Sequence, residues 1–377
     1  MRSIIFKPCR AVMTALWACA LCFVALTISA PRLAYAEGPV YGLWLDADNG
    51  SVAGELVACD SSGRQIEGPA PAWSAVTDLF VGRETVPAYA FMWKMNGDLG
   101  VDYVEAPNVT SVTCLDSCTT LEECAFWPTA EDEGYYSLDK VEHLTLSKNT
   151  VNVDNRTLST MSDGVSVSVA EGNPHFVMGG DALYRIINDA DLAIYPDVIV
   201  DDGLIEAGKG QVELVLWNNA TGPIAAEAFH ENTVSIAPYA MRGTAATSIV
   251  LPNTVLCVGT YAFSDSSQLT SLSIPASVKL LAYDYYDRGD AYWSAGNVTD
   301  GSTRVRFDVD DENKSYMDFN GALYDGSGMT LLNWQHASGE VAVPDGVRAV
   351  GVVAFRGSGV TKVTLPMSVE RVCNMAF

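Results

Sequence analysis

The chain has 377 residues, of which 49% are apolar, and it contains 31 glycines and 16 prolines. This composition suits a folded, turn-rich protein and excludes a disordered one. The formal net charge is −24, and no cluster of lysine and arginine stands out. We therefore expect no nucleic-acid binding, because that affinity depends on basic groups that neutralise phosphates.

Residues 1–36 have the order of a secretory signal peptide. Basic residues come first, the apolar run AVMTALWACALCFVALTISA follows, and the small residues AYA precede Glu37. We expect cleavage after Ala36 and export; the alternative is an uncleaved anchor, since the apolar run is long enough to span a bilayer. The exported chain, with 18 basic and 46 acidic residues, would carry a charge of −28 and no further membrane span.

Six cysteines follow the leader, and three of them are close together in the sequence: Cys114, Cys118 and Cys124. An exported protein permits disulfides, so one local bridge among these three is expected. The alternative is that the six are small core or loop residues with at most one bridge among them. The cluster lacks the paired CxxC spacing and the nearby histidine of a zinc site.

Residues 76–377 contain an internal repeat, whereas residues 37–75 show none and stay unassigned. The segment TSIVLPNTVLCVGTYAF (247–263) aligns with TSLSIPASVKLLAYDYY (270–286), with Pro252 and Pro275 at the same place 23 positions apart. Near the end, GEVAVPDGVRAVGVVAF and VTKVTLPMSVERVCNMAF repeat the unit at a spacing of 22. Weaker versions occupy residues 76–91, 121–126, 141–151 and 224–229. A period in this range predicts a solenoid.

Each part of the short unit has a physical reason. Ile249 and Leu251 lie on one face of a short strand, which Pro252 ends because it has no N–H to donate. Apolar residues spaced by three and four over residues 255–262 predict a helical or 3-10 turn. One unit cannot bury its own apolar face, so stacked units and a parallel strand ladder are expected.

A longer repeat lies between stretches of the short one. Residues 167–195, VSVAEGNPHFVMGGDALYRIINDADLAIY, align with residues 307–334, FDVDDENKSYMDFNGALYDGSGMTLLNW, at an offset of 140. The pattern predicts a strand, a turn and an inserted β-hairpin. We expect two composite modules, at about residues 141–263 and 264–377.

Together, the units LxIPxxVxxIGxxAF and VxxxNxxYxxxxGxLYxxxxxxLxxYP resemble the BspA-type leucine-rich repeat family of bacterial surface proteins. The resemblance implies an irregular right-handed leucine-rich-repeat solenoid, α/β to mainly β, with short parallel strands, short helical or 3-10 turns and inserted β-hairpins. It also implies a secreted or cell-surface protein without enzymatic activity. Such a protein would mediate adhesion to a protein or glycan partner on host or neighbouring bacterial cells. Tyr285 and Tyr286 depart from the pattern, because Ala262 and Phe263 stand there one repeat earlier.

The segment 283–303 interrupts the repeat and contains Arg288, Gly289 and Asp290. This RGD tripeptide resembles the integrin-recognition motif. It holds a cation and a carboxylate on a tight turn, where they could meet an acidic group and a metal ion on a partner. A solvated loop is the alternative.

The outward side chains of the strands form a second candidate site. Since Ile249 and Leu251 are expected to point inward, the residues between them and their counterparts in other repeats should point outward. These candidate residues are Ser248, Val250, Ser271, Ser273, Glu340, Ala342, Lys362 and Thr364. Solenoids commonly bind along such faces. Plain solvent exposure is the alternative, as is a spacer role for the whole region.

An enzyme is the rival class. The sequence contains no GxSxG, HExxH or Walker pattern. The four histidines lie in or beside repeat units, where a structural role is expected. Two acidic clusters could hold Ca²⁺ through oxygen atoms, but neither has the twelve-residue loop spacing, so solvated acidic faces and no cofactor are expected. The clusters are Asp308, Asp310 and Glu312, and Asp197, Asp201 and Asp202.

The sequence closes on VCNMAF, a turn segment whose apolar side chains would be covered by a further unit. Solenoids need capping units at their ends. We therefore expect an uncapped last repeat and a native chain that continues past Phe377.

Overall fold

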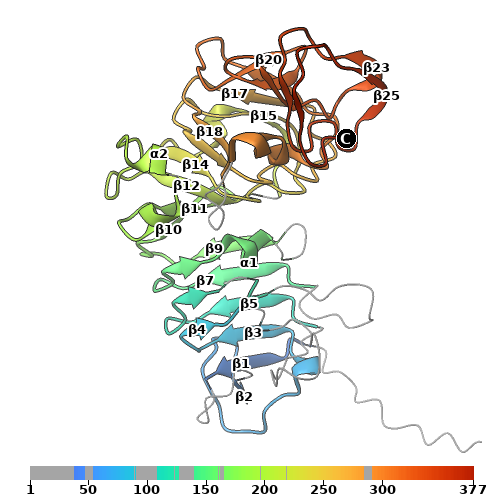
Figure 1. Ribbon diagram of the computed structural model, residues 1–377. Coiled ribbons are helices and arrows are strands. Elements are labelled where there is room, and N and C mark those ends of the chain that lie inside the picture. Colours follow the sequence, from blue (N-terminus) through green and yellow to red (C-terminus); the bar gives the residue numbers. More distant parts are fainter. Residues whose placement is uncertain are drawn as a thin grey trace, which may run out of the picture. The chain divides into compact units, whose positions relative to one another are not determined.

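The computed structural model describes residues 38–46, 54–88, 90, 108–122, 124–126, 140–159, 161, 165–195, 197–217, 219–283 and 291–377. The chain divides into two units, Met1–Gly38 and Pro39–Phe377. The helices and strands given below all belong to the second unit. Figure 1 shows these strands lying side by side as ladders.

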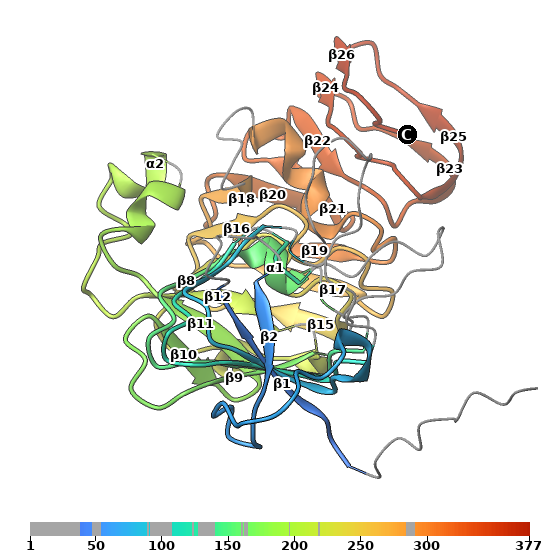
Figure 2. The ribbon, with the colours of Figure 1, turned by 90° about the horizontal axis from the view of Figure 1, so that it is seen from below.

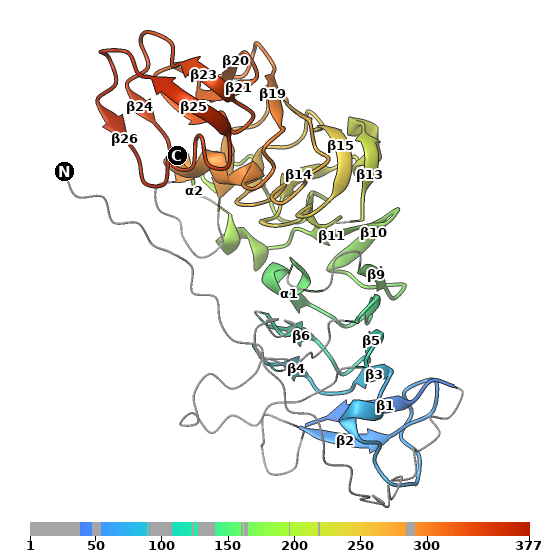
Figure 3. The ribbon, with the colours of Figure 1, turned by 90° about the vertical axis from the view of Figure 1, so that its right-hand side faces the viewer.

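The first repeats build two parallel ladders, and each repeat gives one strand to each (Figure 3). One sheet has the order β2-β1-β3-β5-β7-β9, with the bounds β1 Tyr41–Leu45, β2 Glu55–Ala58, β3 Asp78–Val81, β5 Ser111–Cys114, β7 His143–Leu146 and β9 Ser166–Val169. The other has the order β4-β6-β8, with the bounds β4 Thr85–Val86, β6 Thr120–Leu121 and β8 Asn152–Val153. Strand β1 pairs antiparallel with β2 and parallel with β3, so these two strands extend the first ladder.

A hairpin leads into the second set of ladders. One sheet has the order β10-β11-β12-β14-β16-β18, with the bounds β10 Phe176–Gly179, β11 Ala182–Ile186, β12 Val212–Leu216, β14 Thr233–Ile236, β16 Cys257–Gly259 and β18 Leu280–Tyr283. The other has the order β13-β15-β17-β19, with the bounds β13 Thr221–Ile224, β15 Ala245–Val250, β17 Ser271–Ile274 and β19 Arg306–Val309.

The last repeats form two more sheets, shown as separate groups of strands in Figure 2. Their orders are β20-β21-β22-β24-β26 and β23-β25, with the bounds β20 Tyr316–Phe319, β21 Ala322–Asp325, β22 Thr330–Asn333, β23 Ser338–Ala342, β24 Ala349–Val350, β25 Gly359–Thr364 and β26 Arg371–Val372. The described helices are short: η1 Trp73–Ala75, α1 Asn155–Ser159, η3 Asp191–Ile194, α2 Asp197–Val200, η4 Ala226–Ala228 and η5 Ala291–Thr299.

The strand register confirms the predicted stacking of the short unit. Ile249 of β15 pairs with Leu272 of β17, 23 positions later, and both side chains are buried. Leu251 is buried too, while Val250 between them is 43% exposed. Burying one such aliphatic side chain is worth about 1.5–3 kcal/mol, and stacking joins these contributions into continuous cores. The molecule is a β-rich repeat solenoid, as the sequence predicts.

The longer repeat is confirmed up to the end of its hairpin, at residues 186 and 325. Beyond that point the predicted alignment of residues 187–195 with 327–334 is wrong, because residues 330–333 form β22, which takes the place of β12 at residues 212–216. Strands β9, β10 and β11 begin at residues 166, 176 and 182, and β19, β20 and β21 begin at 306, 316 and 322, each 140 positions later. The two hairpins have the same register, with Phe176 opposite Arg185 in one and Tyr316 opposite Asp325 in the other. The inserted hairpin expected from the sequence is therefore present in both modules.

The helical or 3-10 turn predicted over residues 255–262 is wrong in its centre. Cys257–Gly259 is strand β16, which pairs in parallel with β14 and β18. These ladder hydrogen bonds satisfy backbone groups that would otherwise be buried without partners. Gly259 lies so close to Pro238 that a Cβ atom would collide with the proline's backbone. Strand pairing thus overrides the helical spacing of the apolar residues.

The ending of the unit has a repeated backbone conformation. In five repeats the residue before a buried alanine has a positive φ, between 52° and 62°. Non-glycine residues rarely adopt this left-handed conformation, which turns the chain sharply away from the strand. The five residues are Cys124, Tyr239, Tyr261, Val353 and Met375. The alanine that follows is at most 2% exposed, so the turn leaves no room for a larger side chain.

The six cysteines follow the alternative of small core or loop residues, and five of them are buried. All six described cysteines are free, so the local disulfide is not formed. Cys114 and Cys118 are both buried and share a hydrogen bond, which lowers the pKa of Cys118 and, together with burial, raises that of Cys114. Burial raises the pKa of the Cys257 thiol to about 12. Among the described helices, none has the length and apolarity needed to cross a membrane.

Candidate binding surface

The outward face of β13, β15, β17 and β19 carries four of the predicted site residues in register. Ser248 pairs with Ser271, and Val250 pairs with Ser273. The first row continues to Arg306 and the second to Asp308 on the neighbouring strand β19. The Ser273 hydroxyl donates a hydrogen bond of 2.9 Å to Asp308 Oδ2. Short side chains in straight rows leave this face open to a partner.

The other four predicted residues lie on the two-stranded sheet of β23 and β25. Glu340 is opposite Lys362, and Ala342 is opposite Thr364. Lys362 Nζ lies 3.0 Å from Glu340 Oε2, and both side chains are more than 60% exposed. An ion pair this exposed adds little stability, because water screens it. Its charges remain accessible to a partner.

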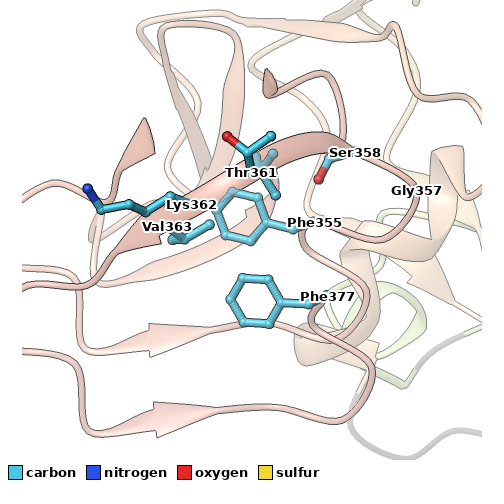
Figure 4. Close-up of a pocket in the computed structure, with 8 residues that line it drawn as sticks. Phe355, Gly357, Ser358, Thr361, Lys362, Val363 and Phe377 are labelled. Carbon is cyan, nitrogen blue, oxygen red and sulfur yellow. The ribbon is translucent and has the colours of Figure 1, made fainter. Parts of the chain in front are cut away.

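A pocket of about 480 Å³ lies beside this sheet (Figure 4). The rings of Phe355 and Phe377 stack at 5.2 Å with an angle of 1° between them, and they face one side of the pocket. Lys362 lines the pocket from strand β25, while its amino group points away from the two rings in Figure 4 and pairs with Glu340.

The structure thus divides the predicted surface in two. Ser248, Val250, Ser271 and Ser273 share one sheet, while Glu340, Ala342, Lys362 and Thr364 share another. All eight side chains are exposed or half-buried, as predicted. The tripeptide Arg288-Gly289-Asp290, like Tyr285 and Tyr286, lies outside the described residues. Within the described ranges, no group of three or more His, Cys, Asp or Glu is arranged to hold a metal ion.

Sequence reasoning missed a buried polar network around Glu213 of β12. Glu213 is 0% exposed, and its Oε2 lies 3.1 Å from Arg185 Nη1. Its Oε1 accepts hydrogen bonds from the hydroxyls of Tyr283 at 2.6 Å and Ser235 at 3.2 Å. The one available signal was an acidic residue inside the otherwise apolar strand VELVL. Its partners could not be identified, since they lie 28, 70 and 22 positions away.

Comparison with known protein families assigns part of this architecture. The family model described as the BspA type leucine rich repeat region matches residues 224–287, with six copies. This segment is a BspA-type leucine-rich repeat region. It contains strands β14–β18, which belong to both sheets of the second set. Leucine-rich repeat families of this kind are generally non-enzymatic binding proteins of the bacterial cell surface.

The solved structures that match this chain share little sequence with it. The pneumococcal vaccine antigen PcpA is 14% identical with a TM-score of 0.36, over 79% of this chain and 54% of that one. A leucine rich cell surface protein of Faecalibacterium prausnitzii is 13% identical with a TM-score of 0.42, over 78% and 64%. A leucine-rich repeat protein of Eubacterium ventriosum is 12% identical with a TM-score of 0.28, over 81% and 52%.

The chain therefore spans about half to two thirds of the length of these three proteins. A search among curated protein sequences found no match to it.

Proposed function

We propose that this leucine-rich repeat protein is exported and mediates adhesion by binding a protein partner on host or neighbouring cells. The site is the outward face of β13, β15, β17 and β19. One observation carries the proposal: two in-register rows, Ser248–Ser271–Arg306 and Val250–Ser273–Asp308, cross adjacent strands. Regularly spaced short side chains let a partner approach the sheet closely, which is how solenoids commonly bind.

The face offers both polar and apolar contacts. Val250 is 43% exposed, which gives an apolar contact that a partner could bury. Arg306 and Asp308 place opposite charges at the end of the two rows, both exposed to solvent. Such charges favour a partner with the complementary order of charges and raise its association rate.

The test uses the full exported chain on an array of extracellular-matrix and bacterial surface proteins. The double variant Ser248→Arg/Ser271→Arg puts two long side chains on the face. The control, Asn253→Arg/Gln268→Arg, makes the same charge change on exposed turn residues. We expect the face variant to weaken binding at least about tenfold, the equivalent of about 1.4 kcal/mol, and the control less than twofold.

Equal effects of the two double variants would place the site elsewhere. Absence of any bound partner would favour the spacer role instead.

An integrin-directed role for Arg288-Gly289-Asp290 is the second proposal. The tripeptide falls between β18 and η5, where the repeat is interrupted. Changing Asp290→Glu keeps the charge but lengthens the side chain, so integrin-dependent cell attachment should be lost. Asp287→Glu makes the same change three positions earlier and should have no effect. Attachment that survives Asp290→Glu would exclude this role.

A further inference from the structure

A second pocket, of about 530 Å³, lies in the first module. It is formed by β8, the β10–β11 hairpin and the segment that begins η3, and it falls within the volume range of small-molecule sites, about 300–1,000 Å³. Its polar lining residues are Asn152, Asp154, His175, Arg185, Asn188 and Asp191. None of them is among the residues of the outward strand face.

Arg185 joins the walls of this pocket. Its Nη2 donates a hydrogen bond of 3.0 Å to the carbonyl of Val153 in β8, and its Nη1 lies 3.1 Å from Glu213 in β12. Its Nε lies 3.9 Å from Asp191 of η3. Asp191 also accepts a hydrogen bond from the backbone N–H of Asn188, at 3.0 Å. The pocket is thus preorganised by contacts among its own walls.

The second module shows that the scaffold does not need this arrangement. Asp325 stands where Arg185 stands, opposite the first residue of the hairpin. Thr330 takes the place of Glu213 on the next strand. Glu213 precedes Leu214, the partner of Tyr184, and pairs with Ser235 of the following repeat. Thr330 precedes Leu331, the partner of Tyr324, and pairs with Ala349 of the following repeat. The pocket wall also disappears, since residues 187–211 are replaced by the short turn 326–329.

A buried ion pair has a large desolvation cost. One module contains it together with a pocket-forming insertion, while the other folds with neither. This difference points to a ligand rather than to stability as the reason for the insertion.

The lining chemistry indicates the ligand class. The amide, carboxylate and guanidinium groups of the lining offer both hydrogen-bond donors and acceptors. They suit the hydroxyl groups of a ligand, because each hydroxyl can donate and accept a hydrogen bond. Ile194 and Ala190 add an apolar wall. Among the lining residues, the carboxylates of Asp154 and Asp191 outnumber the single guanidinium of Arg185, which is itself paired with Asp191 and with the buried Glu213. This excess of negative charge disfavours an anionic ligand.

We propose that this pocket binds a neutral sugar, as a mono- or disaccharide unit of a glycan. The carboxylates and amides hold its hydroxyl groups, and the apolar wall contacts its C–H face. Negative charge excludes sialylated and sulfated sugars. This site is separate from the strand face that we propose for protein binding, so failure of either proposal leaves the other standing.

The test begins with the full exported chain on an array of neutral, sialylated and sulfated oligosaccharides, followed by calorimetric titration with the neutral glycan that binds best. The variant Ala190→Trp fills the pocket from an exposed position, and Asn152→Ala removes one exposed amide. We expect Ala190→Trp to abolish binding and Asn152→Ala to weaken it at least about fivefold, the effect of one lost hydrogen bond.

The matched control is Asp189→Asn, at an exposed neighbour of the pocket, compared with Asp191→Asn inside it. Asp189→Asn should leave affinity unchanged, and Asp191→Asn should reduce it. Because Asp191 also supports the fold, each variant's melting temperature is measured. If Asp191→Asn is unfolded, the test depends on the result for Ala190→Trp. Absence of neutral-glycan binding at millimolar concentration, preference for acidic glycans, or full affinity in Ala190→Trp would overturn the proposal.

Discussion

Asn173 and Asn313, 140 positions apart, make the same four hydrogen bonds in the two modules. Asn173 Oδ1 accepts from the backbone N–H groups of His175 at 2.7 Å and Phe176 at 2.9 Å. Its Nδ2 donates to the carbonyls of Ser147 at 2.7 Å and Thr150 at 2.9 Å in the preceding repeat. One side chain therefore shapes the start of the hairpin and fixes it to its neighbour.

Asn313 repeats this arrangement. Its Oδ1 accepts from the N–H groups of Ser315 at 2.8 Å and Tyr316 at 2.9 Å, and its Nδ2 donates to the carbonyls of Pro275 at 2.8 Å and Val278 at 3.2 Å. The asparagine of the pattern VxxxNxxY is thus explained by geometry, because only an amide offers both an acceptor and two donors at this length.

We predict that Asn313→Ala lowers the free energy of unfolding by about 2–4 kcal/mol, since four hydrogen bonds of about 1 kcal/mol each are lost. Asn173→Ala should have a similar effect, and the double variant should be additive because the two residues share no partners. Urea denaturation measures both. Asn313→Asp keeps the two accepted bonds but places a buried carboxylate oxygen against the carbonyls of Pro275 and Val278, so at neutral pH its loss should be at least as large. A loss below about 0.5 kcal/mol for Asn313→Ala would contradict this account.

Tyr184 and Tyr324 occupy the same place in the two hairpins but differ in hydrogen bonding. The Tyr184 hydroxyl accepts a bond of 3.1 Å from the N–H of His230. His230 lies six positions before Ile236, the ladder partner of Leu214, and Pro344 lies six positions before Val350, the ladder partner of Leu331. Pro344 therefore takes the place of His230, and a proline has no N–H. Within the described part of the chain, the buried Tyr324 hydroxyl has no hydrogen-bond partner.

We predict opposite effects for the two Tyr→Phe changes. Tyr324→Phe removes an unsatisfied buried hydroxyl and should raise the free energy of unfolding by about 1 kcal/mol. Tyr184→Phe removes the acceptor of the His230 N–H and should lower it by about 1 kcal/mol. Chemical denaturation at neutral pH compares the two variants. A loss of stability in both variants would contradict the conclusion that the Tyr324 hydroxyl is buried without a hydrogen-bond partner.

The same tyrosine gives a pH dependence. Burial raises the pKa of Tyr324 to about 12, because the phenolate is poorly solvated inside the protein. The unfolded chain, with a tyrosine pKa near 10, ionises first, so stability is intact below about pH 10 and falls as the pH rises toward 12. Tyr324→Phe should make this loss smaller. Denaturation curves of both proteins at pH 9 and pH 11 measure this loss. If the free energy of unfolding falls by the same amount between these pH values in Tyr324→Phe and in the unchanged protein, the prediction is contradicted.

The ion pair of Arg185 and Glu213 should be strongly coupled. Replacing Arg185 by Met leaves the fully buried Glu213 without its cation, which should cost about 3–5 kcal/mol. Adding Glu213→Gln removes the uncompensated charge while an amide oxygen remains to accept from Ser235 and Tyr283, so much of the loss should be recovered. A double-mutant cycle in urea measures this coupling. Purely additive effects would show that the pair does not interact.

Much of the fold could be predicted because repetition makes it visible in the sequence. The offset of 140 positions placed both hairpins, and the alternation around Ile249 gave the inward and outward faces. Strand β16 was missed because spacings of three and four at Val255, Val258 and Ala262 also suit a helix, and the parallel partners that decide the matter lie about 23 positions away. Local spacing could not reveal this pairing.

The candidate sites were less accessible to prediction. The exposure of Ser248 and Lys362 follows from the alternation of side chains along a strand. That these two residues lie in different sheets depends on where each ladder ends, which the alternation does not show. The pocket beside Arg185 depends on an ion pair between residues 28 positions apart and on an insertion with no repeat pattern. Such sites form where a chain departs from its own periodicity, and the periodic signal carries no information there.

The central claim is that successive units stack in register as a parallel ladder. Ser248 and Ser271 are paired across β15 and β17, so their Cα atoms should lie at the strand spacing of about 4.8 Å, within the range a disulfide requires. The diagonal pair Val250 and Ser271 should lie about 7–8 Å apart, beyond that range.

Oxidation of the two double-cysteine variants, followed by mass-spectrometric mapping of the disulfides, measures this register most directly. We predict rapid and complete cross-linking in Ser248→Cys/Ser271→Cys and little in Val250→Cys/Ser271→Cys. Equal cross-linking in both, or none in the first, would contradict the stacked ladder.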